Sequence, residues 1–249
     1  MKTDQVFDLT DAHSQALKQM VFLWIEAEAG APGMPGYRPI FNYTDLNHYT
    51  DLGRTLGIET DPASFSPAEQ KRVEDFHVSL GTALEIALSV TPLSPGDYSY
   101  PNYFAGFQDP SVIEPFMPPK FIPWDDHSSE YEAVPVPQGP TISFHLTDQH
   151  LTLARALRVD WGGFNSYTGI NFKRPYGDMT YIELDMAALL GIPLPSSEAQ
   201  GKSDFTEEQL RVFHQLHTDM LYVVPLILWN SSLPSGRYTL HDDRWILNP

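Results

Sequence analysis

Apolar side chains recur every three or four residues along two long stretches of this chain. This spacing predicts amphipathic helices at residues 66–90 and 206–229. Each begins with a capping box, in which a hydroxyl caps the first turn and a side chain three residues later reaches back to it. The capping-box pairs are Ser66 with Glu69 and Thr206 with Gln209. Pro225 lies inside the second helix and predicts a kink near residues 221–224.

Shorter helices are expected before each long one. Thr10 and Thr147 are predicted N-caps. The apolar spacing after Thr10 predicts a helix that includes Trp24 and ends by Gly30. The helix after Thr147 should end near residue 157. Two further helices are expected, at about 44–56 and from 178 or 180 to 190, with Gly57 and Gly191 just after them as C′ residues. An extended segment should begin at Tyr98, and residues 237–240 and 245–247 should pair as short strands.

The order of these elements reflects an internal repeat. Residues 7–13 return as residues 144–150 with five of seven positions identical. Residues 65–98 align without a gap to residues 205–238, with six identities in 34. Other shared positions keep the same order, and they are Trp24 with Trp161, Arg38-Pro39 with Arg174-Pro175, and Leu56-Gly57-Ile58 with Leu190-Gly191-Ile192. Self-similarity over such a period indicates two copies of one structural unit.

The predicted fold is mainly α, with two tandem homologous three-helix units that carry short β additions and are related by a pseudo-two-fold axis. Unit 1 covers residues 1–98 and unit 2 covers residues 142–249. The chain is expected to be a monomer with an internal pseudo-dimer, in which the two long helices meet near the centre. Units this small gain by packing on each other, because small domains bury proportionally little surface.

Residues 99–141 connect the units and are expected to form an extended strap. Nine of these 43 residues are proline, and acids outnumber bases six to one. Such a composition is typical of disordered linkers. The segment also holds eight aromatic residues, which favours a proline-stiffened strap docked on the helical units. A partner-binding arm is the alternative.

The net charge restricts the possible partners of the protein more than any sequence motif does. The formal net charge is −17, of which residues 1–140 carry −13 and residues 141–249 carry −4. Nucleic acids and anionic membranes attract basic surfaces, so both are disfavoured as partners. An acidic surface suits a basic protein partner, and the alternative is that it only maintains solubility. The chain has no cysteine, which excludes disulfides, thiolate metal sites and a cysteine nucleophile. The first residues have no apolar core of a signal peptide, and a cytoplasmic location is expected.

The repeated histidines are the first candidates for chemistry. Each unit offers two histidines and one carboxylate, a ligand set that non-haem iron sites use. The candidate metal ligands are Asp11, His13 and His77 in unit 1 and Asp148, His150 and His217 in unit 2. Because an Asp and a His two positions apart at a helix start do not share a face, the spacing favours core histidines instead. No metal or other cofactor is expected.

A second candidate is the loop Lys173-Arg174-Pro175-Tyr176-Gly177, just before a predicted helix. Two cations beside a helix N-terminus can hold an anion, so Lys173, Arg174 and Tyr176 are candidate anion-binding residues. Alternatively, Arg174 pairs with an acid such as Asp185 and fixes the loop. Unit 1 retains only Arg38-Pro39 at the equivalent place, which favours the structural interpretation.

The chain resembles a family of small bacterial domains with the pattern Leu-Thr-x-x-His, Trp, Glu-x-Gly-Ala-Pro and Lys-Arg-Pro-Tyr-Gly-Asn. Unit 2 has Leu146-Thr147-Asp148-Gln149-His150, Trp161 and Lys173-Arg174-Pro175-Tyr176-Gly177-Asp178, whereas unit 1 has Trp24 and Glu28-Ala29-Gly30-Ala31-Pro32. The resemblance implies no activity. Each unit lacks a different part of the pattern, so neither would hold a complete catalytic site unless the site spans both units.

No nucleotide-binding, metalloprotease or serine-hydrolase motif is present in the sequence. The function expected is therefore a non-enzymatic, acidic protein-binding module, most concretely an immunity or antitoxin-type inhibitor of a bacterial toxin. The acids expected to contact the partner are Asp109, Glu114, Asp125, Asp126, Glu130 and Glu132. Two alternatives stay open: a metal-dependent enzyme or small-molecule binder that uses the repeated Asp and His residues, and a scaffold protein of a phage or secretion system.

Overall fold

A computed structural model of the 249-residue chain describes most of the two predicted units. The described residues are 5–26, 37–43, 48–58, 61–102, 104, 136–160, 169–172, 182–193, 205–242 and 244–248. For 21–26, 37–43, 48, 160, 169–172 and 182 the description covers the backbone alone.

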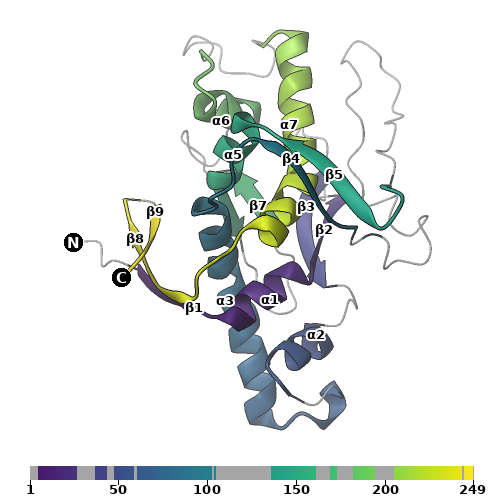
Figure 1. The fold of residues 1–249 in the computed structure, drawn as a ribbon, viewed down its shortest axis with the longest axis vertical. Coiled ribbons are helices and arrows are strands. Elements are labelled where there is room, and N and C mark those ends of the chain that lie inside the picture. The colour runs from purple at the N-terminus through teal and green to yellow at the C-terminus, as the bar shows by residue number, and fades with distance from the viewer. Residues whose placement is uncertain are drawn as a thin grey trace.

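The same order of elements occurs twice along the chain (Figure 1). The N-terminal half contains β1 (Gln5–Leu9), α1 (Asp11–Lys18), β2 (Met20–Glu26), β3 (Tyr37–Tyr43), α2 (His48–Thr55), α3 (Pro67–Ser89) and β4 (Gly96–Pro101). The C-terminal half contains β5 (Thr141–Leu146), α5 (Asp148–Arg155), β6 (Leu157–Asp160), β7 (Gly169–Phe172), α6 (Ile182–Leu189), α7 (Glu207–Asn230) and β8 (Gly236–His241). A short 3-10 turn, η1 (Pro62–Ser64), precedes α3, and a last strand, β9 (Arg244–Leu247), follows β8.

The prediction of a mainly α fold is wrong, because the described residues form a mixed α/β fold with three sheets. The largest error lies after the first helix, where α1 ends at Lys18 and the chain continues as β2. The β2 sequence, Met-Val-Phe-Leu-Trp-Ile-Glu, is rich in aromatic and β-branched residues, which favour strands. A continuous apolar run also contains apolar residues at helical spacing. Periodicity alone therefore predicts a helix where the structure has a strand.

Two of the sheets are formed by strands from different halves. β1 pairs antiparallel with β8, and Phe7 lies opposite Tyr238. β5 pairs in the same way with β4, and Phe144 lies opposite Tyr98. Each half thus gives its first strand to the last strand of the other half. β9 extends the first of these sheets, as predicted from the sequence of the last residues.

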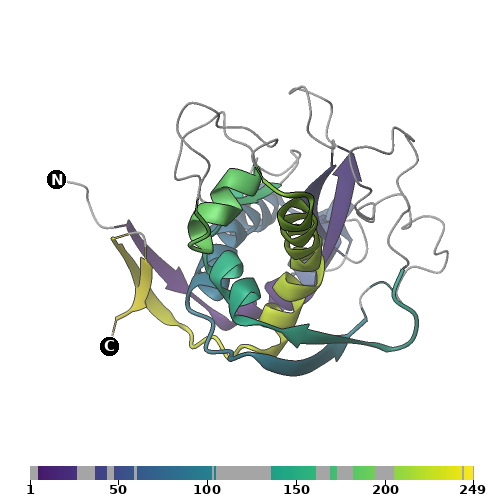
Figure 2. The same cartoon turned by 90° about the horizontal axis from the view of Figure 1, so that it is seen from above.

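The third sheet joins the two β-hairpins in the strand order β2-β3-β7-β6. Its central contact is between the halves, where Ile40 of β3 lies opposite Gly169 of β7. The long helices contact its two outer strands crosswise: α3 packs against β6, and α7 packs against β2. Figure 2 shows the helices gathered at the centre, with the β4–β5 ribbon and the β1–β8–β9 sheet on the outside.

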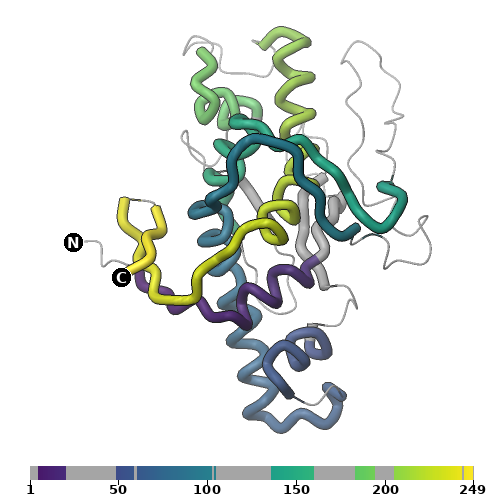
Figure 3. The backbone as a smooth tube through the Cα atoms, viewed as in Figure 1, coloured from purple at the N-terminus to yellow at the C-terminus, as the bar shows by residue number. Residues whose placement is uncertain are grey.

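The core is continuous between the halves. It includes residues of α1, α3, α5 and α7 that are almost fully buried, such as Leu17, Leu84, Leu153 and Leu221. The two long helices contact each other, as predicted (Figure 3). Just after their ends, the hydroxyls of Thr91 and Ser231 are 2.8 Å apart and buried. These residues hold the same position in the two halves, so the contact lies where a pseudo-two-fold axis would pass.

The predicted helix ends are confirmed at several places. Both long helices have the capping boxes expected from the sequence. Gly57 and Gly191 both adopt φ 68°, a left-handed conformation that glycine takes without steric cost. At each, the last helical turn closes with a Schellman pattern, in which the following isoleucine donates to the carbonyl five residues back. α7 continues through Pro225 to Asn230.

Most of the predicted strap lies outside the described residues. Residues 99–101 belong to β4 and Thr141 opens β5, so both ends of the predicted 99–141 segment are strands of one ribbon. The two ends are further tied together by the Asn102 amide, which donates to the carbonyls of Pro137 and Gly139 at 2.9 and 2.8 Å. Across the described part of the chain, none of the helices combines the length and the apolar character needed to cross a bilayer.

Candidate functional site

His13 forms a buried polar cluster at the start of α1. Thr10 caps the helix, and its backbone N–H donates to Nδ1 of His13 over 3.1 Å. Since Nδ1 accepts this bond, the neutral ring carries its proton on Nε2, which donates to Oγ of Ser79 over 2.9 Å. The Ser79 hydroxyl donates in turn to the carbonyl of Phe76. Every polar atom of the imidazole therefore has a partner.

His150 forms the equivalent cluster at the start of α5. The Thr147 backbone N–H donates to Nδ1 of His150 over 3.2 Å, and Nε2 of His150 donates to a carboxylate oxygen of Asp219 over 3.1 Å. The other oxygen of Asp219 accepts from the Gln215 amide over 2.8 Å. In the repeat, Asp219 holds the position that Ser79 holds in the first half. The two halves thus share the histidine cap. They differ in the group that accepts from Nε2, which is a hydroxyl in the first half and a carboxylate in the second.

Two histidines, His13 and His217, have lowered pKa values. Burial lowers the pKa of His13 to about 4, because the imidazolium would lose its hydration in the core. Burial, with His214 as a second cause, lowers the pKa of His217 to about 3. Neutral rings that donate and accept fixed hydrogen bonds suit structural caps and core positions.

The predicted Asp and His metal sets do not assemble. Asp11 accepts a hydrogen bond from the Ser235 hydroxyl. Asp148 is exposed at the start of α5. His77 is buried in the middle of α3, with 3% of its surface exposed. Among the residues that the structure describes, no three His, Asp or Glu side chains are placed to hold a metal ion. The spacing argument against a shared ligand face is consistent with this arrangement.

The structure places two buried carboxylates in short helices, one of which, Asp185, the sequence suggests only as a partner for Arg174. Asp51 of α2 and Asp185 of α6 are 5% and 2% exposed. They occupy the same place in the repeat, since each lies six positions before the glycine that ends its helix, Gly57 or Gly191. Arg54 lies 3.5 Å from Asp51 and is half exposed. The repeat alignment held the signal that could have found this pair, because both halves keep the Asp at this spacing.

The other predicted site residues lie outside the described residues. These are the anion-binding candidates Lys173, Arg174 and Tyr176 and the partner-binding acids Asp109, Glu114, Asp125, Asp126, Glu130 and Glu132. Their roles stay predictions.

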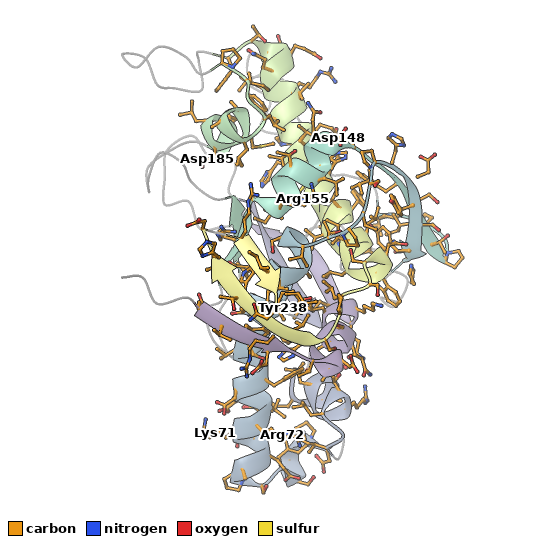
Figure 4. All side chains as sticks on the ribbon, turned by 60° about the vertical axis from the view of Figure 1, so that its left-hand side comes forward. Lys71, Arg72, Asp148, Arg155, Asp185 and Tyr238 are labelled. Atoms are coloured by element: carbon orange, nitrogen blue, oxygen red, sulfur yellow. The ribbon has the colours of Figure 1, made fainter. Side chains whose placement is uncertain are left out.

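Four of the described cations form ion pairs with carboxylates. The ion pairs are Arg54–Asp51 at 3.5 Å, Lys71–Asp75 at 2.6 Å, Arg211–Glu208 at 2.6 Å and Arg237–Asp8 at 2.9 Å. Figure 4 shows Lys71 and Arg72 near the start of α3, far from Arg155 on α5. Exposed acids occur in both halves of the described chain.

Comparison of the chain with protein-family models, with curated proteins and with solved structures finds no match. The likeness to the small bacterial domain family stays a prediction. The chemistry of the chain is therefore interpreted from its own residues, which offer capped, satisfied histidines and an acidic surface.

Proposed function

We propose that this protein is a non-enzymatic binding module whose acidic surface recognises a basic protein partner, most concretely as a cytoplasmic immunity or antitoxin-type inhibitor of a bacterial toxin. The observation that carries the proposal is the net charge of −17, most of which belongs to the N-terminal half and the connecting segment. A surface of one sign steers an oppositely charged protein toward it and accelerates association.

The described surface supports this proposal. Four exposed cations are paired with carboxylates, and the chain as a whole has 17 more acidic than basic side chains. His13 and His150 serve as helix caps, and both ring nitrogens of each have hydrogen-bond partners, an arrangement that gives stability. Both features favour recognition over chemistry.

A charge-neutralised variant tests the proposal through its partner. The six acids to be replaced by the matching amides are Asp109, Glu114, Asp125, Asp126, Glu130 and Glu132. Pull-down from the native host with the wild-type protein should recover a basic protein at stoichiometric amounts. The variant should recover at least tenfold less, and raising the salt should weaken the wild-type complex, because screening removes the electrostatic attraction.

The control variant removes the same number of charges elsewhere. Six exposed acids suit this purpose, namely Asp75, Asp97, Asp148, Glu207, Glu208 and Asp242. This control should retain most of the binding, because it changes the total charge equally and leaves the predicted contact acids in place. Recovery of no basic partner by the wild-type protein, or equal loss in both variants, contradicts the predicted binding surface.

A further inference from the structure

We infer that the two halves of this chain form a complete non-covalent interface, so that they stay associated when residues 105–135 no longer link them. The chain is then a fused form of a strand-exchanged dimer, and the partner that each half fits is a second unit of the same kind.

The exchanged strands are the first support. Among the described strands, β1 has β8 as its only neighbour, and β4 has only β5. In both ribbons the partner strand comes from the other half, so each half alone would leave these backbone donors and acceptors unpaired. Unpaired edges of this kind are costly when buried and prone to wrong pairing when exposed. Five residue pairs in one ribbon and six in the other are formed between halves.

The outer strands of the four-stranded sheet give the second support. A carboxylate oxygen of Glu85, on α3, accepts from the backbone N–H of Val159, on β6, over 3.0 Å. An acid of one half thereby covers a strand edge of the other. Arg155 of α5 donates in a similar way to the carbonyl of Thr91, over 3.4 Å. These bonds, with the crosswise packing of α3 and α7, place main-chain groups of each half in contact with side chains of the other.

The buried contact between Thr91 and Ser231 gives the third support. Both residues are 4% exposed, and their hydroxyls bond to each other across the halves. The adjoining core is shared, because the long helices contact each other as well as the strands beyond. Interfaces that are as hydrophobic as a domain core are typical of subunits that form permanent complexes.

The test is a full-length chain with a specific protease site inserted between residues 120 and 121. The uncut protein should match the wild type in circular dichroism and melting temperature. After cleavage, both fragments should elute together at the position of the intact protein and separate only in denaturant. The melting temperature should become dependent on protein concentration, because unfolding then releases two chains. Fragments that separate in native buffer overturn the inference.

A second measurement covers the case in which the inserted site disturbs folding. Residues 1–120 and 121–249 are co-expressed with an affinity tag on one of them. Co-purification at equal amounts supports the inference, and recovery of the tagged fragment alone overturns it.

A matched pair of variants locates the interface in the cleaved protein. Thr91→Val removes the hydroxyl that contacts Ser231 and should weaken association of the fragments about five- to tenfold. Ser89→Ala removes a hydrogen bond within α3, to the carbonyl of Ile86, and should leave association within twofold of the wild type. Equal effects of the two variants contradict the proposed contact.

Discussion

At the scale of single residues, His13 makes stability depend on pH. Its pKa is about 4 in the folded protein and about 6.5 in the unfolded chain, so below pH 6.5 the unfolded state binds the proton more readily. Stability is therefore complete above pH 6.5 and falls as the pH drops toward 4, by up to about 3 kcal/mol. Below pH 4 both states are protonated and this loss stops growing. Urea unfolding between pH 4 and 7.5 measures it.

The substitution His13→Gln removes the titrating imidazole and tests it separately from the helix cap. Glutamine at the equivalent place already completes the capping box of α7, where Gln209 bonds to the Thr206 backbone. The variant should retain the cap and lose part of the pH dependence between 4 and 6.5. A pH profile identical to that of the wild type would show that His13 is not a source of the dependence; His217, with its pKa of about 3, would then be the group to replace next.

Ser79 and Asp219 show how far the two halves have diverged at one position. Both accept from the Nε2 proton of a capping histidine, yet one is a neutral hydroxyl and the other a carboxylate. A second pair exchanges the acid between the strands: Asp8 faces Arg237 in one ribbon, and His145 faces Asp97 at the equivalent place in the other. The two halves therefore share the arrangement of their backbone elements, whereas side chains at equivalent positions differ in chemistry.

At the scale of elements, the glycines after α2 and α6 are a matched pair. Neither has any atom within 4 Å of a Cβ built on it, so substitution meets no steric clash. Gly57→Ala and Gly191→Ala should each lower the free energy of unfolding by about 1 kcal/mol, because alanine is strained at φ 68°. Asparagine, which tolerates this conformation better, should cost less at both positions. Denaturant unfolding checks both values, and a loss several times larger would indicate an unrecognised contact.

Local signals in the sequence were sufficient to predict helix ends. Ser66 with Glu69, Thr206 with Gln209, and Gly57 are recognised because a cap depends on residues within one turn. The strands were harder to predict. β1 depends on β8, which lies near the opposite end of the chain, and nothing near Phe7 indicates such a partner. The β2 segment is predicted as helix because its short apolar run fits the helical period as well as a buried strand.

The candidate site was predictable only in part. His13 and His150 stood out because the repeat preserves them, yet their partners Ser79 and Asp219 differ between the halves and so gave no repeated signal. The sequence does not reveal that Asp51 and Asp185 form a buried pair of equivalent positions, although both halves keep them. A buried carboxylate looks like any surface acid until the burial of its helix is known.

At the scale of the whole molecule, the interlocked halves should unfold as one. Their strands, long helices and core are shared, so a substitution in one half should shift the transition of both. The predicted boundaries at residues 98 and 142 thus follow the repeat along the chain, whereas the sheets connect elements on both sides of them.

The first and last described strands share one sheet, because β1 and β9 both pair with β8. Figure 1 shows β1, at the purple start of the described chain, and β9, at its yellow end, on either side of β8. A circular permutant is therefore accessible, in which a short glycine-serine linker joins residue 249 to residue 1 and new ends are opened between residues 120 and 121. It would exchange the order of the two halves along the chain while retaining every pairing between them. Native-like circular dichroism and a cooperative melt of this permutant are the expected result, and they would show that the order of the two units in the gene is immaterial to the fold.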